Sequence, residues 1–247
     1  MLKSLYKTAT IHHRTVLTQG IGESRIEGII EKWVEKLPDN MRISYLPATG
    51  RVRLRISGSG DENILEQIDA EISKMIELLY PFHYGYDDDI LESVVGKLLS
   101  DRKQTLAIAE SCTGGYLSHM ITSIAGSSDY FLGSMTTYCN EVKEKWIDVK
   151  PEVLQKVGAV SSEVVEAMAV GIRNQSGADY TVATSGIAGP DGGTPEKPVG
   201  TVWIGFAGPN GVSSKKLVLG LSRIRNIEVT SLTALNMLRV KILENKA

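Results

Sequence analysis

The sequence predicts an α/β protein in two parts: a small α+β unit, followed by a mixed sheet sandwiched between helices. In the first half, strand-like and helix-like segments follow each other in the order β-α-β-β-α. In the second half, apolar strand-like runs alternate with helical patterns, and Pro209-Asn210-Gly211 marks a single hairpin. Strands that alternate with helices, together with one hairpin, indicate a mixed α/β/α sandwich.

The elements of the first part follow from the spacing of its apolar residues. Near its middle, Val52, Leu54 and Ile56 alternate with arginines, as in a strand with one buried face. Two longer segments carry isoleucine and leucine at intervals of three and four, which indicates amphipathic helices. We expect strands at residues 13–19, 42–46 and 51–57 and helices at residues 23–37 and 61–79.

A boundary between the two parts is expected in the segment 80–89. This segment is aromatic and rich in turn-forming residues, and it ends in three aspartates that favour the start of a helix. We place the first domain at residues 1–82 and the second at residues 87–247. A chain of 247 residues is long enough for two such domains.

The second part alternates between the two kinds of element. Serine is favoured at helix N-caps, so Ser161 or Ser162 is expected to begin the helix that follows it. We expect strands at residues 106–109, 133–138, 179–185, 200–207 and 212–219, and helices at residues 91–99, 115–124, 141–147, 151–157, 162–175 and 223–244.

The composition excludes several classes of protein. The net charge is −2, so no bulk attraction to nucleic acid or to an anionic membrane is expected. No apolar run approaches the roughly 20 residues that span a bilayer, and residues 1–7 lack the apolar core of a secretory signal. Cys112 and Cys139 lack metal-ligand spacing, so we expect no metal and reduced thiols in the cytoplasm. Packing as small residues is the favoured role of both cysteines.

The segment 109–115, Ala-Glu-Ser-Cys-Thr-Gly-Gly, is the most informative part of the chain. It follows an apolar run and precedes a helical pattern, which places Ser111 on a tight turn from strand to helix. Such a turn suits a nucleophile, because Gly114 and Gly115 let the backbone bend and bring N–H groups close to an oxyanion or phosphate. The alternative is an ordinary helix N-cap, for which serine and threonine are also favoured.

A serine nucleophile needs a base. His119 lies eight residues after Ser111 on the following helix, roughly 12 Å along its axis, so a Ser-His-Asp arrangement is poorly supported. A Ser-Lys arrangement is possible, because burial or a neighbouring positive charge lowers the pKa of a lysine. Lys143 is the candidate, since Tyr138 at a strand end, Asn140 in a turn and Lys143 at a helix start can meet at the end of the sheet. The alternative is a solvated lysine.

Three segments in this order resemble the C-terminal domain of the CinA (competence/damage-inducible) family. They are residues 110–115, residues 137–143 (Thr-Tyr-Cys-Asn-Glu-Val-Lys) and the glycine- and proline-rich stretch 184–203. The resemblance covers roughly residues 90 to 245. Residues 15 to 80 resemble, more weakly, the middle domain of that family, a KH-type α+β unit, on segments 15–24 and 45–50.

The resemblance implies a nicotinamide-nucleotide amidase of pyridine nucleotide salvage. It implies that Ser111 works with Lys143 and Tyr138, and all three residues match. Where the family usually has serine before the asparagine, this chain has Cys139, which perturbs the pocket mildly. Where the family typically has threonine before Gly-Ile-Ala-Gly-Pro, it has Ser185, which keeps a hydroxyl.

The loop 186–200 is too rich in glycine and proline for a helix or strand, and its N–H groups could hold a phosphate or shape an oxyanion site. The alternative is an ordered surface loop. Arg223 falls where the family shows Gly-Asp-Arg, but here the two preceding residues are Leu221 and Ser222. Two roles for Arg223 are therefore equally favoured: a contact with the substrate phosphate, and a structural role at the start of the helix. The expected substrate-binding residues are Thr113, Gly114, Gly115, Asn140, Ser185, Gly186, Gly189, Pro190 and Arg223.

The implied reaction is hydrolysis of the carboxamide of nicotinamide mononucleotide to nicotinic acid mononucleotide and ammonia. Ser111, deprotonated by Lys143, would form an acyl-enzyme, N–H groups near residues 113–115 would stabilise the oxyanion, and Tyr138 would pass a proton to the leaving ammonia. This chemistry needs no metal and no cofactor. The family also implies a homodimer or higher homo-oligomer.

Two rival interpretations concern binding without catalysis. KH modules bind nucleic acid through a Gly-x-x-Gly loop, but none occurs before residue 90, and residues 1–80 carry eleven basic and eleven acidic residues. Nucleic acid is therefore an unlikely partner, the arginines of segment 51–55 are interpreted as a solvated strand face, and a structural or dimerisation role fits this domain better. The other rival is a homologue that binds the nucleotide without turning it over, although the proposed catalytic trio is intact.

Many family members also carry an N-terminal domain resembling molybdopterin-binding proteins. This chain begins after it, so we expect a truncated form or a short homologue.

Overall fold

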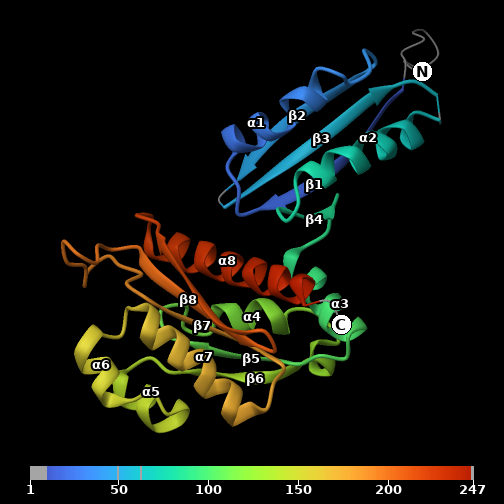
Figure 1. Cartoon of the computed structure of the whole chain (residues 1–247). Coiled ribbons are helices and arrows are strands. Elements are labelled where there is room, and N and C mark those ends of the chain that lie inside the picture. The colour runs from blue at the N-terminus through green and yellow to red at the C-terminus, as the bar shows by residue number, and fades with distance from the viewer. Residues whose placement is uncertain (1–9, 49, 62, 246–247) are drawn as a thin grey trace, which may run out of the picture. The chain divides into compact units, whose positions relative to one another are not determined.

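The computed structural model describes residues 10–48, 50–61 and 63–245. The chain divides into two compact units, with the division between Ile90 and Leu91 (Figure 1). Each unit has its own sheet, and the predicted fold class is confirmed: a small α+β unit precedes a mixed sheet with helices on both faces. No helix in these described ranges is long and apolar enough to cross a membrane.

The first unit is a four-stranded antiparallel sheet with two helices. Its sheet has the order β2-β3-β1-β4, and each neighbouring pair of strands is antiparallel. The elements in chain order are β1 (Ile11–Gln19), α1 (Glu23–Val34), β2 (Met41–Ala48), β3 (Arg51–Ser59), α2 (Ile64–Leu78) and β4 (His83–Tyr86).

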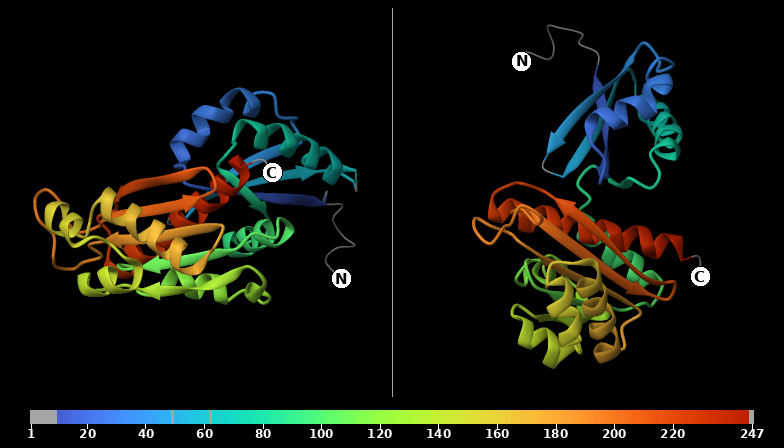
Figure 2. Two further views of the ribbon diagram at one scale, coloured as in Figure 1. Left: turned by 60° about the horizontal axis from the view of Figure 1, so that its bottom comes forward. Right: turned by 60° about the vertical axis from the view of Figure 1, so that its left-hand side comes forward.

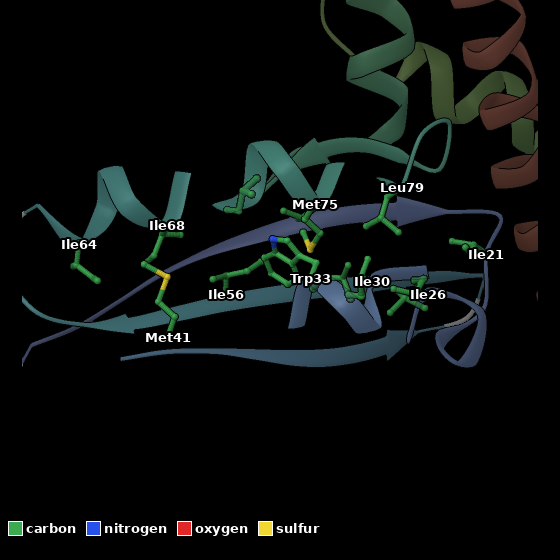
Figure 3. Close-up of a cluster of buried hydrophobic side chains, with 14 residues drawn as sticks. Ile21, Ile26, Ile30, Trp33, Met41, Ile56, Ile64, Ile68, Met75 and Leu79 are labelled. Atoms are coloured by element: carbon green, nitrogen blue, oxygen red, sulfur yellow. The ribbon is translucent and has the colours of Figure 1, made fainter. Parts of the chain in front are cut away.

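The core of the first unit lies between the sheet and its two helices. Figure 3 shows Ile30 and Trp33 of α1, Met75 of α2 and Ile56 of β3 together in this layer. On β3 the buried residues alternate with exposed or half-buried ones, so the expected period of two is confirmed. The arginines at positions 51 to 55 therefore face away from the helices.

The segment 80–89 is a correction to the sequence analysis, which treated it as a boundary and expected no strand there. It contains β4, which pairs with β1 through Val16 and Tyr86. Asp87 extends the contact, because its carboxylate accepts a hydrogen bond of 2.8 Å from the Thr15 N–H. A four-residue strand with a glycine is too short to show a period of two, which is why the pattern missed it.

The second unit is a five-stranded mixed sheet in the order β6-β5-β7-β8-β9. The first three strands run parallel, and β8 and β9 join them antiparallel. The elements are α3 (Leu91–Asp101), β5 (Leu106–Glu110), α4 (Tyr116–Thr122), a 3₁₀ turn at Ser127–Asp129, β6 (Phe131–Thr136), α5 (Asn140–Ile147), α6 (Pro151–Val157), α7 (Ser162–Ser176), β7 (Tyr180–Gly186), β8 (Thr201–Gly208), β9 (Gly211–Val218) and α8 (Arg223–Glu244).

Helices cover both faces of this sheet. Figures 1 and 2 show α5, α6 and α7 on one face and α8 on the other, where α8 packs with α3 and α4. Ala107 and Ala109 of β5 belong to the core beneath α5, α6 and α7. Because side chains alternate along a strand, Glu110 points to the face of α4 and Ser111 returns to the face of α5. This alternation places two polar residues of one motif on opposite sides of the sheet.

Local details of the second unit agree with the predictions, apart from the end of β6. The hairpin between β8 and β9 has two loop residues, because Gly208 pairs with Gly211. The N-cap of α7 is Ser161, whose hydroxyl accepts a hydrogen bond from the Val164 N–H. Strand β6 ends at Thr136 rather than at residue 138. The carbonyl oxygens of residues 137 and 138 turn instead to a side chain of α5, described below.

Candidate active site

The candidate site lies at the carboxyl ends of β5, β6 and β7. The chain leaves β5 for β6 on one side and later returns to β7 on the other side of β5. Ligands of α/β proteins commonly bind at such a point, outside the carboxyl ends of the strands. A pocket of about 290 Å³ opens here, close to the lower end of the usual range of roughly 300–1,000 Å³ for small-molecule sites.

The turn after β5 is built as its glycines predict. Gly114 and Gly115 have φ values of +61° and +97°, which residues with a Cβ rarely adopt. The turn is closed by a hydrogen bond of 3.2 Å from the Gly114 N–H to the Ser111 carbonyl oxygen. The Ser111 N–H continues the parallel ladder and donates to the Thr184 carbonyl oxygen over 2.9 Å. The serine is therefore held at the end of the strand, not at the cap of the helix.

Glu110 is a functional residue that the sequence analysis did not single out. Its side chain is 0% exposed, and its carboxylate accepts hydrogen bonds from the N–H groups of Gly115 (3.0 Å), Leu117 (3.1 Å) and Ser118 (2.9 Å), and from the Ser118 hydroxyl. The N-terminus of α4 is thus satisfied by a carboxylate of the chain itself. An acidic residue six positions before the first residue of a helix was the available signal.

This corrects one expectation about the turn. The N–H groups of Gly114 and Gly115 were expected to face an oxyanion or phosphate, but both donate to acceptors inside the protein. Thr113 is also turned inward, since its hydroxyl shares a hydrogen bond of 2.7 Å with the Thr184 hydroxyl. None of Thr113, Gly114 and Gly115 lines the pocket.

Lys143 of α5 is buried beside Ser111. Its side chain is 1% exposed, and Nζ lies 3.2 Å from Ser111 Oγ, 2.8 Å from the Thr137 carbonyl oxygen and 3.1 Å from the Tyr138 carbonyl oxygen. Burial lowers the pKa of Lys143 from its ordinary value. Within the described residues no carboxylate forms an ion pair with this amine, and the neighbouring thiols of Cys139 and Cys112 oppose the shift less than burial drives it. The alternative of a solvated lysine does not hold.

The three contacts of Lys143 satisfy the three donors of an ammonium, and they also suit a neutral amine. A neutral amine has two N–H donors and one lone pair. The donors fit the two carbonyl oxygens, which can only accept, and the lone pair then faces the Ser111 hydroxyl, which can donate. This arrangement can take the proton of Ser111 as its oxygen attacks an electrophile.

Cys112 lies next to Ser111 and also lines the pocket, so its thiol is a rival nucleophile. Burial raises the pKa of Cys112 to about 12, which leaves almost no thiolate near neutral pH. Cys139, the other free cysteine, is exposed and precedes α5. The geometry and the protonation state therefore favour the oxygen of Ser111 as the attacking atom.

The opposite wall comes from the loop after β7 and the start of α8. Arg223 donates from its guanidinium to the Gly189 carbonyl oxygen (2.7 Å) and to the Tyr138 hydroxyl (3.2 Å). Asn226, one turn later, donates to the Ala188 carbonyl oxygen (2.9 Å) and was missed by the sequence analysis. The first turn of α8 therefore fixes the loop.

Eight of the predicted residues line the pocket, and four do not. Ser185 lines it, but its hydroxyl donates to the Ala159 carbonyl oxygen over 2.7 Å and is therefore partnered inside the protein. Pro190 lies outside the lining, as do the three turn residues named above. Residues that the structure adds to the wall include Cys112, Asp191 and Gly192. Predicted residues that line the pocket are Ser111, Tyr138, Asn140, Lys143, Ser185, Gly186, Gly189 and Arg223.

Metal ligands are not gathered at this pocket. In the part of the chain that the structure describes, no group of three or more His, Cys, Asp or Glu side chains could hold a metal ion. The titratable groups at the reacting end are instead a lysine, a serine and a thiol.

Two family models match the chain in the order that the motifs indicate. The model described as "Damage-inducible protein CinA KH domain" matches residues 13–81, and "CinA C-terminal domain" matches residues 88–242. The chain belongs to the CinA family. The KH-type resemblance of the first unit and the resemblance of the second are both confirmed by these matches.

Relatives and solved structures agree with this assignment. The chain is 47% identical to the CinA-like protein of Cytophaga hutchinsonii, over 99% of this chain and 59% of that protein, and 40% identical to that of Flavobacterium psychrophilum, over 97% and 58%. It therefore spans little more than half the length of these curated CinA relatives. The crystal structure of a competence/damage inducible protein from Agrobacterium tumefaciens is 37% identical, with a TM-score of 0.60 over 61% of this chain and 92% of that chain. The crystal structure of a competence damage-inducible protein from Klebsiella pneumoniae is 31% identical to this chain. Its TM-score is 0.61, over 63% of this chain and 97% of that chain.

Proposed function

We propose that this CinA-family chain is a nicotinamide-nucleotide amidase, which hydrolyses the carboxamide of nicotinamide mononucleotide. One observation carries the proposal: a buried lysine with a lowered pKa has its Nζ 3.2 Å from a serine hydroxyl at the mouth of a small-molecule pocket. This pair supports acyl transfer, and the motif resemblance supplies the substrate.

The acylation half of the reaction follows from the contacts of the pair. Lys143 takes the hydroxyl proton as Ser111 Oγ forms a bond to the carboxamide carbon, and the electron pair of the C=O bond moves to oxygen. When that pair returns, the C–N bond breaks and the nitrogen leaves as ammonia after receiving a proton. Tyr138 is the proposed relay for this proton, since its carbonyl oxygen touches Lys143 and its hydroxyl reaches the same pocket.

The deacylation half uses water with the same base. Lys143 takes a proton from water, the hydroxide adds to the acyl carbon, and the C–O bond to Ser111 breaks with return of the proton to Oγ. The sum is amide plus water to carboxylic acid plus ammonia. The carbonyl oxygens of residues 137 and 138 hold the amine in place through both halves.

Arg223 is the proposed contact for the substrate phosphate. It lies in the pocket wall at the start of α8, where its charge and the helix N-terminus both favour an anion. The N-terminus of α4, in contrast, is already occupied by the carboxylate of Glu110. The phosphate is therefore expected on the α8 side of the pocket and the carboxamide on the Ser111 side.

The test is ammonia release from nicotinamide mononucleotide by the parent and by Ser111→Ala. Ser123→Ala is a matched control, because this serine follows α4, its hydroxyl donates to the carbonyl oxygen of Met120, and it does not line the pocket. Turnover by the parent and the control but not by Ser111→Ala supports the amidase. If the folded parent binds the nucleotide without releasing ammonia, the chain is a non-catalytic binding protein. Equal turnover by all three overturns the choice of nucleophile.

A further inference from the structure

We infer that the backbone N–H of Cys112 binds the oxyanion that forms during acyl transfer at Ser111. The inference rests on the proposed function, because it assigns one more group to the same reaction. Attack on a carboxamide places a negative charge on its oxygen, and preorganised N–H donors at that position are usually the largest single contribution to catalysis. The structure leaves few donors close enough to Ser111 for this role.

The N–H groups around Ser111 can be followed one by one. The Ser111 N–H donates to the Thr184 carbonyl oxygen, and the Gly114 N–H donates to the Ser111 carbonyl oxygen. The next two residues of the turn are engaged as well: the Gly115 N–H by Glu110, and the following N–H by the Thr113 carbonyl oxygen. Within the described residues, the N–H groups at positions 112 and 113 of this turn donate to no oxygen acceptor, and that of Cys112 has only its own thiol beside it.

The pocket distinguishes these two donors. Cys112 lines the pocket together with Ser111, whereas Thr113 does not. The Cys112 nitrogen is also bonded directly to the carbonyl carbon of Ser111, so covalent geometry keeps it close to the attacking oxygen. In α/β-hydrolases the N–H of the residue after the nucleophile serves as an oxyanion donor. A donor without an oxygen acceptor, adjacent to the nucleophile, fits that role here.

Glu110 engages the other N–H groups after the turn. Its carboxylate draws the N–H groups of Gly115, Leu117 and Ser118 to the α4 side of the sheet. Burial keeps the thiol of Cys112 protonated by raising its pKa to about 12, so the side chain is a poor nucleophile and only a weak hydrogen-bond donor. What Cys112 offers to a substrate is therefore its backbone.

The experiment removes the donor and keeps the Cys112 side chain, although it also weakens the Ser111 carbonyl oxygen as the acceptor of the Gly114 N–H. Replacement of Cys112 by its α-hydroxy analogue, 3-mercaptolactic acid, converts the peptide N–H to an ester oxygen and keeps the thiol. We expect kcat for ammonia release to fall by about 10²–10³-fold with little change in KM, as for the loss of one oxyanion donor. The same replacement at Thr113 removes the other unpaired N–H of the turn and is expected to cost less. A larger loss at position 113 than at 112 overturns the assignment.

A second readout separates this inference from the proposed function. Acylation of Ser111 by p-nitrophenyl acetate, followed by release of p-nitrophenol and by mass, needs the nucleophile and the oxyanion donor but not the nucleotide. If the parent is acylated but releases no ammonia from nicotinamide mononucleotide, the proposed substrate is wrong, and the acylation rate still tests the donor. Equal acylation of the parent and the ester at position 112 overturns the inference. A parent that is not acylated at Ser111 overturns both the nucleophile and the donor.

Discussion

The two walls of the pocket differ in how firmly the protein holds them. On the reacting wall, Ser111 and Lys143 are 9% and 1% exposed, and every donor of the lysine has an acceptor. On the α8 wall, Arg223 is exposed, and its guanidinium donates to the Gly189 carbonyl oxygen and to the Tyr138 hydroxyl. Under the proposed function, the chemistry is fixed by burial, whereas recognition depends on side chains that water can also reach. Changes on the first wall should affect kcat, and changes on the second should affect KM.

The largest effect is expected for Lys143. Lys143→Met removes the base, and kcat for ammonia release should fall by about 10²–10⁴-fold, the usual contribution of general base catalysis. Lys143→Arg is the sharper comparison, because it keeps a positive charge that cannot be removed in a protein. If the lysine acts as a base, both variants lose activity alike. An active arginine variant would show that charge, not proton transfer, is the contribution of this residue.

The pH dependence tests the same lysine without a mutation. The reaction needs the neutral amine, so kcat/KM should rise as pH rises through the pKa of Lys143. Because burial lowers this pKa below the ordinary value of 10.5, the rising limb should lie at lower pH than a solvated lysine would give. The measurement is kcat/KM against pH in the parent. A rising limb at or above the ordinary value would contradict the proposed protonation state.

The next largest effect is expected for Glu110→Gln, and it is an effect on the stability of the fold beneath the reacting wall. A glutamine would place an amide N–H₂ against backbone N–H donors, which leaves buried donors unsatisfied and should destabilise the protein by about 2–3 kcal/mol. The free energy of unfolding in denaturant measures this. Glu141→Gln is the control, since this acidic residue lies in the exposed first turn of α5. A Glu110 variant as stable as the control would mean that the cap is not needed.

The α8 wall should show a smaller and different effect. Arg223→Ala removes the proposed phosphate contact, and KM for nicotinamide mononucleotide should rise about tenfold, since a hydrogen bond to a charged group contributes about 1.5–3 kcal/mol and water competes here. Nicotinamide riboside lacks the phosphate, so its KM should change much less. An equal rise for both substrates would assign Arg223 to holding Tyr138 and Gly189 in place.

What could be predicted from the sequence depended on whether the signal is local in the chain. Motif order placed Ser111 and Lys143 in one pocket, where the structure also has them, and periodicity predicted most strands and helices, because both signals are local. Glu110 and Asn226 were missed since their partners are backbone groups, which a sequence does not display. The turn glycines were assigned to the ligand because sequence shows that they permit a bend, but not which acceptor their N–H groups find. Strand β4 was missed because four residues carry no period.

The smallest expected effect concerns the two thiols, of which Cys112 is buried and Cys139 is exposed. Iodoacetamide reacts with thiolate, so near neutral pH it should alkylate exposed Cys139 and spare Cys112, whose pKa burial raises to about 12. Peptide mass analysis after labelling gives the site, and Cys139→Ser should abolish the reaction. Alkylation of Cys112 in the folded protein would mean that the reacting wall opens to solvent, and the wall would then lose the burial that lowers the pKa of Lys143.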